Sequence, residues 1–282
     1  MSIKTVLVLL TGEDGDRAAL RTAMTLAEPF AAHVDAVLAE PRSDEVVYAA
    51  DLRRSINERE ELAVQRRSAA QLAFVLAART SGAAIESEAR GPASGMTASF
   101  RVEPGQLAKL AAPLSLFSDL VVLPPVRDGG RNPLFEACAE VLMTARCPVL
   151  LSAQAAFEGP TEHIAIGWDG SLSAAHALVA ALPLLERQGS VQLLTVQRGQ
   201  ADNAADASEA VEYLALHGVR AEHRIVAAKG RISTELAAAA RELGCGLLVL
   251  GAYGHSRTME KIFGGVTDDI ARRATLPVFL AH

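Results

Sequence analysis

Short apolar runs alternate along the whole chain with longer segments in which apolar residues recur at helical spacing. In the second half the runs are HIAIGWD, VQLLTVQ, EHRIVA, GLLVLGA and PVFLAH, separated by alanine-rich stretches such as ISTELAAAARELG. Strands that are apolar on both faces are typical of a parallel sheet covered by helices on both sides. The pattern therefore predicts a doubly wound α/β fold, in which ligands bind beyond the carboxyl ends of the strands.

The same pattern occurs twice in the chain. TVLVLLTGEDGDRAALRTAMTLA aligns with HIAIGWDGSLSAAHALVAALPLL at one constant offset, which places Gly12 on Gly170 and Leu20 on Leu178. Later, DLVVLPP aligns with GLLVLGA, and ARCPVLLSA with ATLPVFLAH. A repeat of this kind indicates one structural unit that is built twice. We expect domains at residues 1–153 and 161–282, joined by AQAAFEGPTE.

Composition narrows the classes of protein that the chain can belong to. The net charge of −6 argues against a nucleic-acid-binding protein, because such proteins need a basic face. No apolar run approaches the roughly 20 residues of a membrane span. The N-terminal MSIKTVLVLL reads as a first strand and not as an export signal. Cys138, Cys147 and Cys245 lack metal-ligand spacing, so we expect buried, reduced thiols in a cytoplasmic protein.

Four glycines frame a basic, hydroxyl-bearing stretch, GAYGHSRTMEKIFGGVT, directly after the strand LLVL of the second half. A glycine-rich loop that leads into a helix exposes backbone N–H groups near the positive end of the helix dipole, which suits a phosphate. Asp268 and Asp269 at the same helix start compete with such a ligand. The alternative is that the glycines only turn the chain and cap helices.

The spacing of Gly251, Gly254 and Gly264 resembles the glycine-x2-glycine-x9-glycine signature of the universal stress protein family, and WDGS resembles the end of that family's first strand. The likeness extends over nearly the whole chain, as in tandem members of the family. It implies two five-stranded parallel sheets of order 3-2-1-4-5, flanked by helices. It also implies that the fifth strands pair, giving an internal pseudo-dimer. Whether two chains form a homodimer is left open.

The resemblance also implies an ATP site in the second domain, with Mg²⁺ as a further candidate. Asp169 would contact the adenine or ribose side, and Val196 the base. The phosphates would be held by Gly251, Gly254, Gly264, Gly265 and Thr267. Gly265 departs from the family pattern, which has serine or threonine there. One lost hydrogen bond to a charged group costs about 1.5 to 3 kcal/mol, which weakens binding without abolishing it.

The first domain lacks the corresponding residues, so we expect a degenerate copy. Thr11 stands in the place of Asp169, and Pro124 in the place of Gly251. Proline has no N–H to offer a phosphate.

Two further segments are explained without a ligand. The charged residues 51–67 predict an exposed helix, and residues 91–105 predict the third strand with its flanking loops.

No catalytic set is present in the sequence. It lacks a G-x-S-x-G elbow, an H-E-x-x-H pair and a Walker lysine, so we name no catalytic or metal-binding residue. Three functions stay open: a stress-response regulator that binds ATP, a dimeric scaffold that acts on protein partners without nucleotide, and a slow nucleotide hydrolase. Asp169 has its own alternative, because a strand-end aspartate often caps the following helix.

Overall fold

The computed structural model describes residues 2–41, 56–86, 95–126, 132–153, 163–187, 189–197, 205–253, 269 and 275–282. The chain divides into two compact units. One comprises Ile3–Cys147, and the other Pro148–His282 together with the first two residues. Each unit is described by itself below.

The unit Ile3–Cys147 contains a parallel sheet in which the first strand lies between the second and the fifth. The strand order is β3-β4-β2-β1-β5. Val6, Val8 and Leu9 in the central strand are at most 1% exposed, as expected for a strand covered on both faces. The strands are β1 (Thr5–Leu10), β2 (His33–Glu40), β3 (Ala84–Ile85), β4 (Thr97–Pro104) and β5 (Leu120–Leu123).

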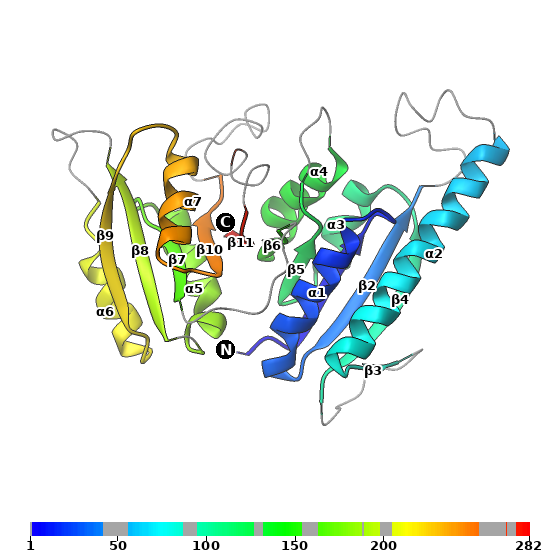
Figure 1. The fold of residues 1–282 in the computed structure, drawn as a ribbon, viewed down its shortest axis with the longest axis horizontal. Helices are drawn as coiled ribbons and strands as arrows, with labels where there is room; N and C mark the ends of the chain where they lie inside the picture. The colour runs from blue at the N-terminus through cyan, green and yellow to red at the C-terminus, as the bar shows by residue number, and fades with distance from the viewer. Residues whose placement is uncertain are drawn as a thin grey trace. The chain divides into compact units, whose positions relative to one another are not determined.

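Helices cover both faces of this sheet. The first two helices pack against each other and alongside β2 and β4 (Figure 1). There the Phe74 ring lies 5.6 Å from that of Phe100. The next two also pack together. Because the strand order changes direction at β1, right-handed crossovers place them on the opposite face. The helices are α1 (Asp16–Ala27), α2 (Ile56–Ser81), α3 (Leu107–Ser115) and α4 (Pro133–Glu140), with short turns at Glu28–Phe30 and Val141–Ala145.

The second unit has the strand order that was predicted. Its own five strands run β9-β8-β7-β10-β11, which is 3-2-1-4-5 in chain order, and all are parallel. The strands are β7 (His163–Gly167), β8 (Ser190–Gln197), β9 (Ala221–Ala227), β10 (Leu247–Gly251) and β11 (Val278–Ala281), and the helices are α5 (Leu172–Leu185), α6 (Ser208–Leu216) and α7 (Ile232–Glu242).

The second unit contains a sixth strand, β6 (Val149–Leu151). In sequence this strand is the end of the first repeat, but its contacts group it with the second unit. It pairs antiparallel with β11, so that Leu150 lies opposite Phe279. The predicted pairing of the two fifth strands is therefore confirmed. In the first repeat the segment 91–105 does contain the third strand, and the two-residue β3 beside it was not predicted.

All three cysteines are free thiols in buried positions. Burial raises the pKa of Cys138 and Cys147 to about 12 and that of Cys245 to about 11. The thiols therefore stay protonated and unreactive at neutral pH. Among the described residues, no helix combines the length and the apolar character that a membrane span requires.

Candidate functional site

The loop at the carboxyl end of β7 exposes Asp169 and Gly170. The Asp169 Oδ1 accepts a hydrogen bond from the Ser171 N–H at 3.0 Å, and the Ser171 hydroxyl accepts one from the N–H of Ala174 at 3.2 Å. Ser171 is thus the N-cap of α5, and Asp169 supports the residue that caps. Gly170 has φ +72°, which favours glycine. The loop holds a carboxylate at the edge of the sheet where ligands of such folds bind.

Val196 lies at the same edge, near the end of the neighbouring strand. Gly167 in β7 is in register with Leu194 in β8. The Trp168 N–H continues the pairing by donating to the Leu194 carbonyl at 2.9 Å, and the Thr195 hydroxyl donates to the Trp168 carbonyl at 3.0 Å. This register brings the strand ends that carry Asp169 and Val196 together.

Trp168 connects this edge to the start of α6. Its indole N–H donates to the Asp206 carbonyl at 2.9 Å. The Asp206 carboxylate accepts the Ser208 hydroxyl at 2.5 Å and the Ser208 N–H at 3.0 Å, and these bonds lower the pKa of Asp206. A Cβ placed on Gly170 would lie 3.5 Å from Ala205. The loop before α6 therefore borders the Asp169 turn, and the sequence pattern gave no sign of this contact.

Gly251, at the end of β10, has a packing reason of its own. A Cβ at this position would lie 2.5 Å from the Ser173 carbonyl carbon and 2.6 Å from the Ala174 nitrogen, closer than real Cβ atoms come to backbone. The first turn of α5 approaches β10 so closely that only glycine fits. The absence of a side chain here thus sets the position of the helix that follows Asp169.

The chain turns sharply after Gly251. Tyr253 has φ +58°, an unusual value for a residue with a side chain. The Ala252 N–H donates to the Ala281 carbonyl at 2.8 Å, and the His282 Nδ1–H donates to the Ala252 carbonyl at 2.9 Å. The Tyr253 and His282 rings lie 6.5 Å apart, edge to face. The last residues of the chain therefore fix the point where the predicted glycine loop begins.

A charged cluster lies at the start of α7, on the same edge of the sheet. Asp269 accepts from Arg231, Nη1 to Oδ1 at 2.8 Å, and from the hydroxyl of Ser233. The Asp269 side chain is 16% exposed and the Arg231 side chain 68%. Asp269 was expected to stabilise the start of its own helix. Its carboxylate binds Arg231, directly before α7, and Ser233 in the first turn of α7, and the expectation for its own helix stays a prediction.

Four of the predicted phosphate-binding residues lie outside the described residues: Gly254, Gly264, Gly265 and Thr267. Their roles stay predictions. The described residues place Asp169, Val196 and Gly251 at the carboxyl ends of β7, β8 and β10. Arg231 and Ser233, which the sequence analysis did not single out, join them at that edge together with Asp269.

In the first repeat, the loop that corresponds to the Asp169 loop is hydrogen-bonded to a carboxylate of its own. The Asp16 side chain accepts the Gly12 N–H at 2.7 Å, the Thr11 N–H at 3.0 Å and the Thr11 hydroxyl at 3.0 Å. Asp16 is 1% exposed, and burial raises its pKa to about 6 in spite of these bonds, which act to lower it. The strand-end amides are already hydrogen-bonded within the loop.

Neighbouring elements also fill the space around this loop in the first repeat. A Cβ on Gly12 would lie 2.4 Å from the Arg66 Cβ of α2, and one on Gly15 would lie 3.1 Å from the Cβ of Pro124. Arg66 also pairs with Glu13, Nη2 to Oε1 at 3.6 Å. The expectation that Thr11 and Pro124 mark a degenerate copy is consistent with this packing.

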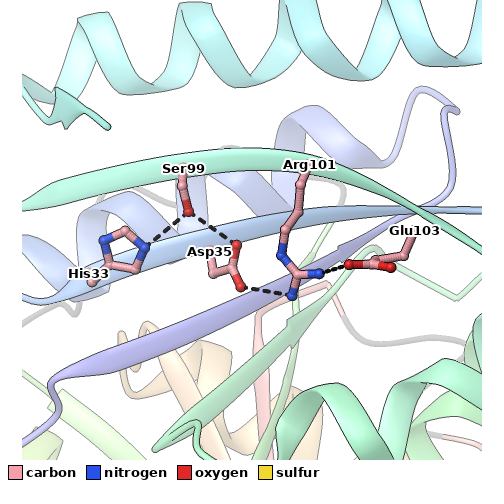
Figure 2. A network of polar contacts seen from close by, with 5 residues as sticks. All are labelled: His33, Asp35, Ser99, Arg101 and Glu103. Carbon is pink, nitrogen blue, oxygen red and sulfur yellow. Dashed lines mark hydrogen bonds and ion pairs between the residues drawn. The ribbon is translucent and has the colours of Figure 1, made fainter. Parts of the chain in front are cut away.

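A polar network lies elsewhere in the first unit, along β2 and β4 (Figure 2). His33 Nε2 lies 3.0 Å from the Ser99 hydroxyl, which donates to Asp35 Oδ1 at 3.1 Å. Arg101 donates from Nη2 to Asp35 Oδ2 at 3.1 Å and from Nη1 to Glu103. Because Ser99 stands between His33 and Asp35, the histidine does not connect a nucleophile to a carboxylate. The network consolidates the sheet and is no catalytic triad.

The Asp169 edge combines a carboxylate, strand-end backbone and one exposed guanidinium. Such groups can bind a ligand by hydrogen bonds, but they include no nucleophile paired with a base. Within the described part of the chain, no three histidine, cysteine or carboxylate side chains are grouped to hold a metal ion.

Two tandem units of this topology define the chain as a Rossmann-like doubly wound α/β protein. Residues 160–282 match the Universal stress protein family model. Over 99% of its length the chain has the fold of a universal stress protein from Archaeoglobus fulgidus DSM 4304, with 15% identity, 96% coverage of that chain and a TM-score of 0.70.

Two further solved structures support the same fold for the whole chain. A functionally unknown protein from Pseudomonas aeruginosa PAO1 is 14% identical and gives a TM-score of 0.53, with 99% of this chain and 92% of that chain covered. A putative universal stress protein from Pseudomonas aeruginosa UCBPP-PA14 is 16% identical and gives a TM-score of 0.50, with 99% and 93% covered. A search of curated proteins found no match.

Proposed function

We propose that this chain is a cytoplasmic stress-response protein whose C-terminal half binds an adenine nucleotide, ATP, in a regulatory or sensing role. The first half supports the second structurally and binds no nucleotide. The match of residues 160–282 to the Universal stress protein family model supports the stress-response role. The three buried thiols are compatible with a reducing compartment.

The observation that carries this proposal is the difference between the two strand-end loops. In the first repeat a buried carboxylate, Asp16, accepts the loop amides. In the second repeat the aligned residue is Ala174, in the first turn of α5, and Asp169 stands exposed at the strand end. At the position where the first repeat has Thr11, the second repeat thus presents a carboxylate that can accept ribose hydroxyl or adenine amino hydrogens from a ligand in solution.

The phosphate side of the proposed site rests on the glycine spacing and on one nearby cation. Gly254, Gly264, Gly265 and Thr267 would supply backbone N–H groups and a hydroxyl to the phosphates. The Arg231 guanidinium is 68% exposed and paired with Asp269, which follows Thr267 by two residues in the sequence. A guanidinium there favours an anionic tail, and Mg²⁺ would accompany the triphosphate.

Trp168 allows a direct test, because it is the only tryptophan in the chain and adjoins Asp169. We expect ATP with Mg²⁺ to change its fluorescence saturably in the wild type. The Gly264→Glu variant should lose at least a decade of affinity, since a carboxylate would repel the phosphates. Gly95→Glu is the matched control, because a side chain at Gly95 meets no atom within 4 Å.

If neither the wild type nor the Gly264→Glu variant gives a binding signal with ATP in fluorescence or calorimetry, the dimeric scaffold without nucleotide is favoured. Steady release of inorganic phosphate above about 1 s⁻¹, near the low end for ordinary enzymes, would favour the hydrolase. Equal binding by both proteins would instead place the nucleotide away from the glycine loop.

A further inference from the structure

Helix α2 is apolar on two opposite faces. Its inner face packs on the sheet through Ala70, Ala73, Phe74 and Ala77, each at most 8% exposed. Its outer face also carries large apolar side chains: Val64 is 60% exposed, Leu72 56% and Leu76 53%. An isolated exposed apolar residue is ordinary, but three on one face of one helix form a contact surface.

The outer residues form one continuous stripe. Val64, Ser68, Leu72 and Leu76 follow one another at intervals of four, so each lies about 40° further around the helix than the last. All four are exposed. Ser68 near the middle is small and lets another helix approach closely. The stripe faces away from Phe74, which contacts Phe100 in β4.

Opposite charges stand at the two ends of this stripe. Glu61 precedes it and Arg79 follows it, and both side chains are exposed. They are separated by about five helical turns, or about 27 Å, so they point in the same direction but cannot reach each other. Among the residues that the structure describes, neither has a partner of opposite charge.

These positions are self-complementary when the helix meets an antiparallel copy of itself. In the register that places the two Ala70 residues at the same height along the helix pair, Val64 lies opposite Leu76 of the second copy. Ser68 then lies opposite Leu72 of the second copy. In the same register Glu61 at each end meets Arg79 of the second copy. Antiparallel packing also places each helix N-terminus beside the C-terminus of the other, which the helix dipoles favour.

We propose that the outer face of α2 is a homodimer interface, formed by antiparallel packing of two α2 helices about a two-fold axis that passes between Ser68 and Leu72. A two-fold interface uses the same patch on both chains, and the symmetric positions of Glu61 and Arg79 fit that requirement. One helix pair buries a small area, so the dimer dissociates readily and forms in a concentration-dependent way.

Charge reversal tests the proposal at the ends of the stripe. Wild-type protein should shift from one chain to two in sedimentation or light scattering as its concentration rises from about 1 to about 300 μM. Glu61→Arg and Arg79→Glu should each weaken dimerisation about tenfold or more, because each creates two like-charge contacts. The double reversal should restore the dimer. Since the two residues are too far apart to interact within one helix, such rescue requires contact between chains.

The apolar positions give an independent test. Leu72→Glu should abolish the dimer, whereas Leu216→Glu, at a residue 87% exposed in the other unit, should leave it intact. Thermal melts of every variant check that the exposed substitutions do not unfold the chain. The proposal is overturned if the wild type stays monomeric at all concentrations, or if neither single charge reversal weakens the dimer. It is also overturned if a foreign peptide binds the stripe while the protein does not self-associate.

Discussion

At the residue scale, Asp16 is a carboxyl group whose buried environment changes its ordinary chemistry. Its carboxyl is 1% exposed, and burial raises its pKa from 3.8 to about 6 against the hydrogen bonds from Thr11 and Gly12. The folded state therefore binds the proton more tightly than the unfolded state does. Its contribution to stability is fully present below about pH 4 and is lost as the pH rises through about 6.

This linkage predicts how Asp16→Asn changes the pH profile. Between pH 4 and 7 the wild type should lose about 3 kcal/mol relative to the variant, since each pKa unit corresponds to 1.36 kcal/mol. Urea unfolding at several pH values measures the difference. Asp14→Asn, at an exposed position on the same loop, should follow the wild type. A difference between wild type and Asp16→Asn that is independent of pH would contradict the assignment.

The sequence located this loop but not the residue that closes it. Aligning the repeats placed Thr11 on Asp169 and so indicated that the acceptor was lost. In the folded chain a different carboxylate reaches this strand end. It belongs to Asp16, which accepts hydrogen bonds from Thr11 and Gly12 and aligns with Ala174 in the first turn of α5. A linear pattern cannot show that a side chain folds back from the helix onto the strand end, because that depends on the path of the loop.

At the element scale, the close contact between β10 and α5 sets a strict limit on residue size. Gly251→Ala would place a Cβ within 2.7 Å of three backbone atoms of Ser173 and Ala174, and backbone cannot yield as a flexible side chain does. We expect a loss of about 2 kcal/mol in the free energy of unfolding. Gly95→Ala, which meets open space, should change it by less than about 0.5 kcal/mol. Equal stability of the two variants would show that α5 moves away freely.

The polar network on β2 and β4 predicts energetic coupling between the strands. Asp35 is the more buried partner, with 9% of its side chain exposed against 37% for Arg101. Arg101→Met should therefore cost more stability than Asp35→Asn, because it leaves a buried carboxylate without its guanidinium. A double-mutant cycle should give a coupling of about 1 kcal/mol between the two residues. Additive losses would show that the ion pair contributes nothing of its own.

Most of the elements could be predicted from the apolar runs, and the exceptions have physical reasons. Buried runs such as LVVL and LLVL are central strands with strong signals. The edge strand β3 is two exposed residues long, so it leaves no hydrophobic pattern. Helix α2 extends to Ser81, beyond the charged segment 51–67, because its apolar second half packs on the sheet.

At the scale of the whole molecule, the repeat boundary in the sequence and the boundary between compact units differ. The sequence repeat places PVLLSA at the end of the first domain, whereas contacts group Pro148 onward with the second. The reason is β6, whose residues Val149, Leu150 and Leu151 pair with β11. Sequence alignment finds repeated units, but strand pairing decides which unit a terminal strand completes.

This pairing predicts different behaviour for two fragments of the second half. A fragment that begins at Pro148 keeps β6 and covers the edge of β11, so it should be monomeric in light scattering. A fragment that begins at Thr161 exposes the backbone of β11 along one edge, beside Phe279 and Leu280, which are at most 2% exposed in the whole chain. Uncovered edge strands pair with other chains, so this fragment should dimerise or aggregate. Its β11 amides should exchange slowly with solvent only in the associated form. If both fragments have the mass of one chain and exchange the β11 amides equally, β6 is not needed to cover that edge.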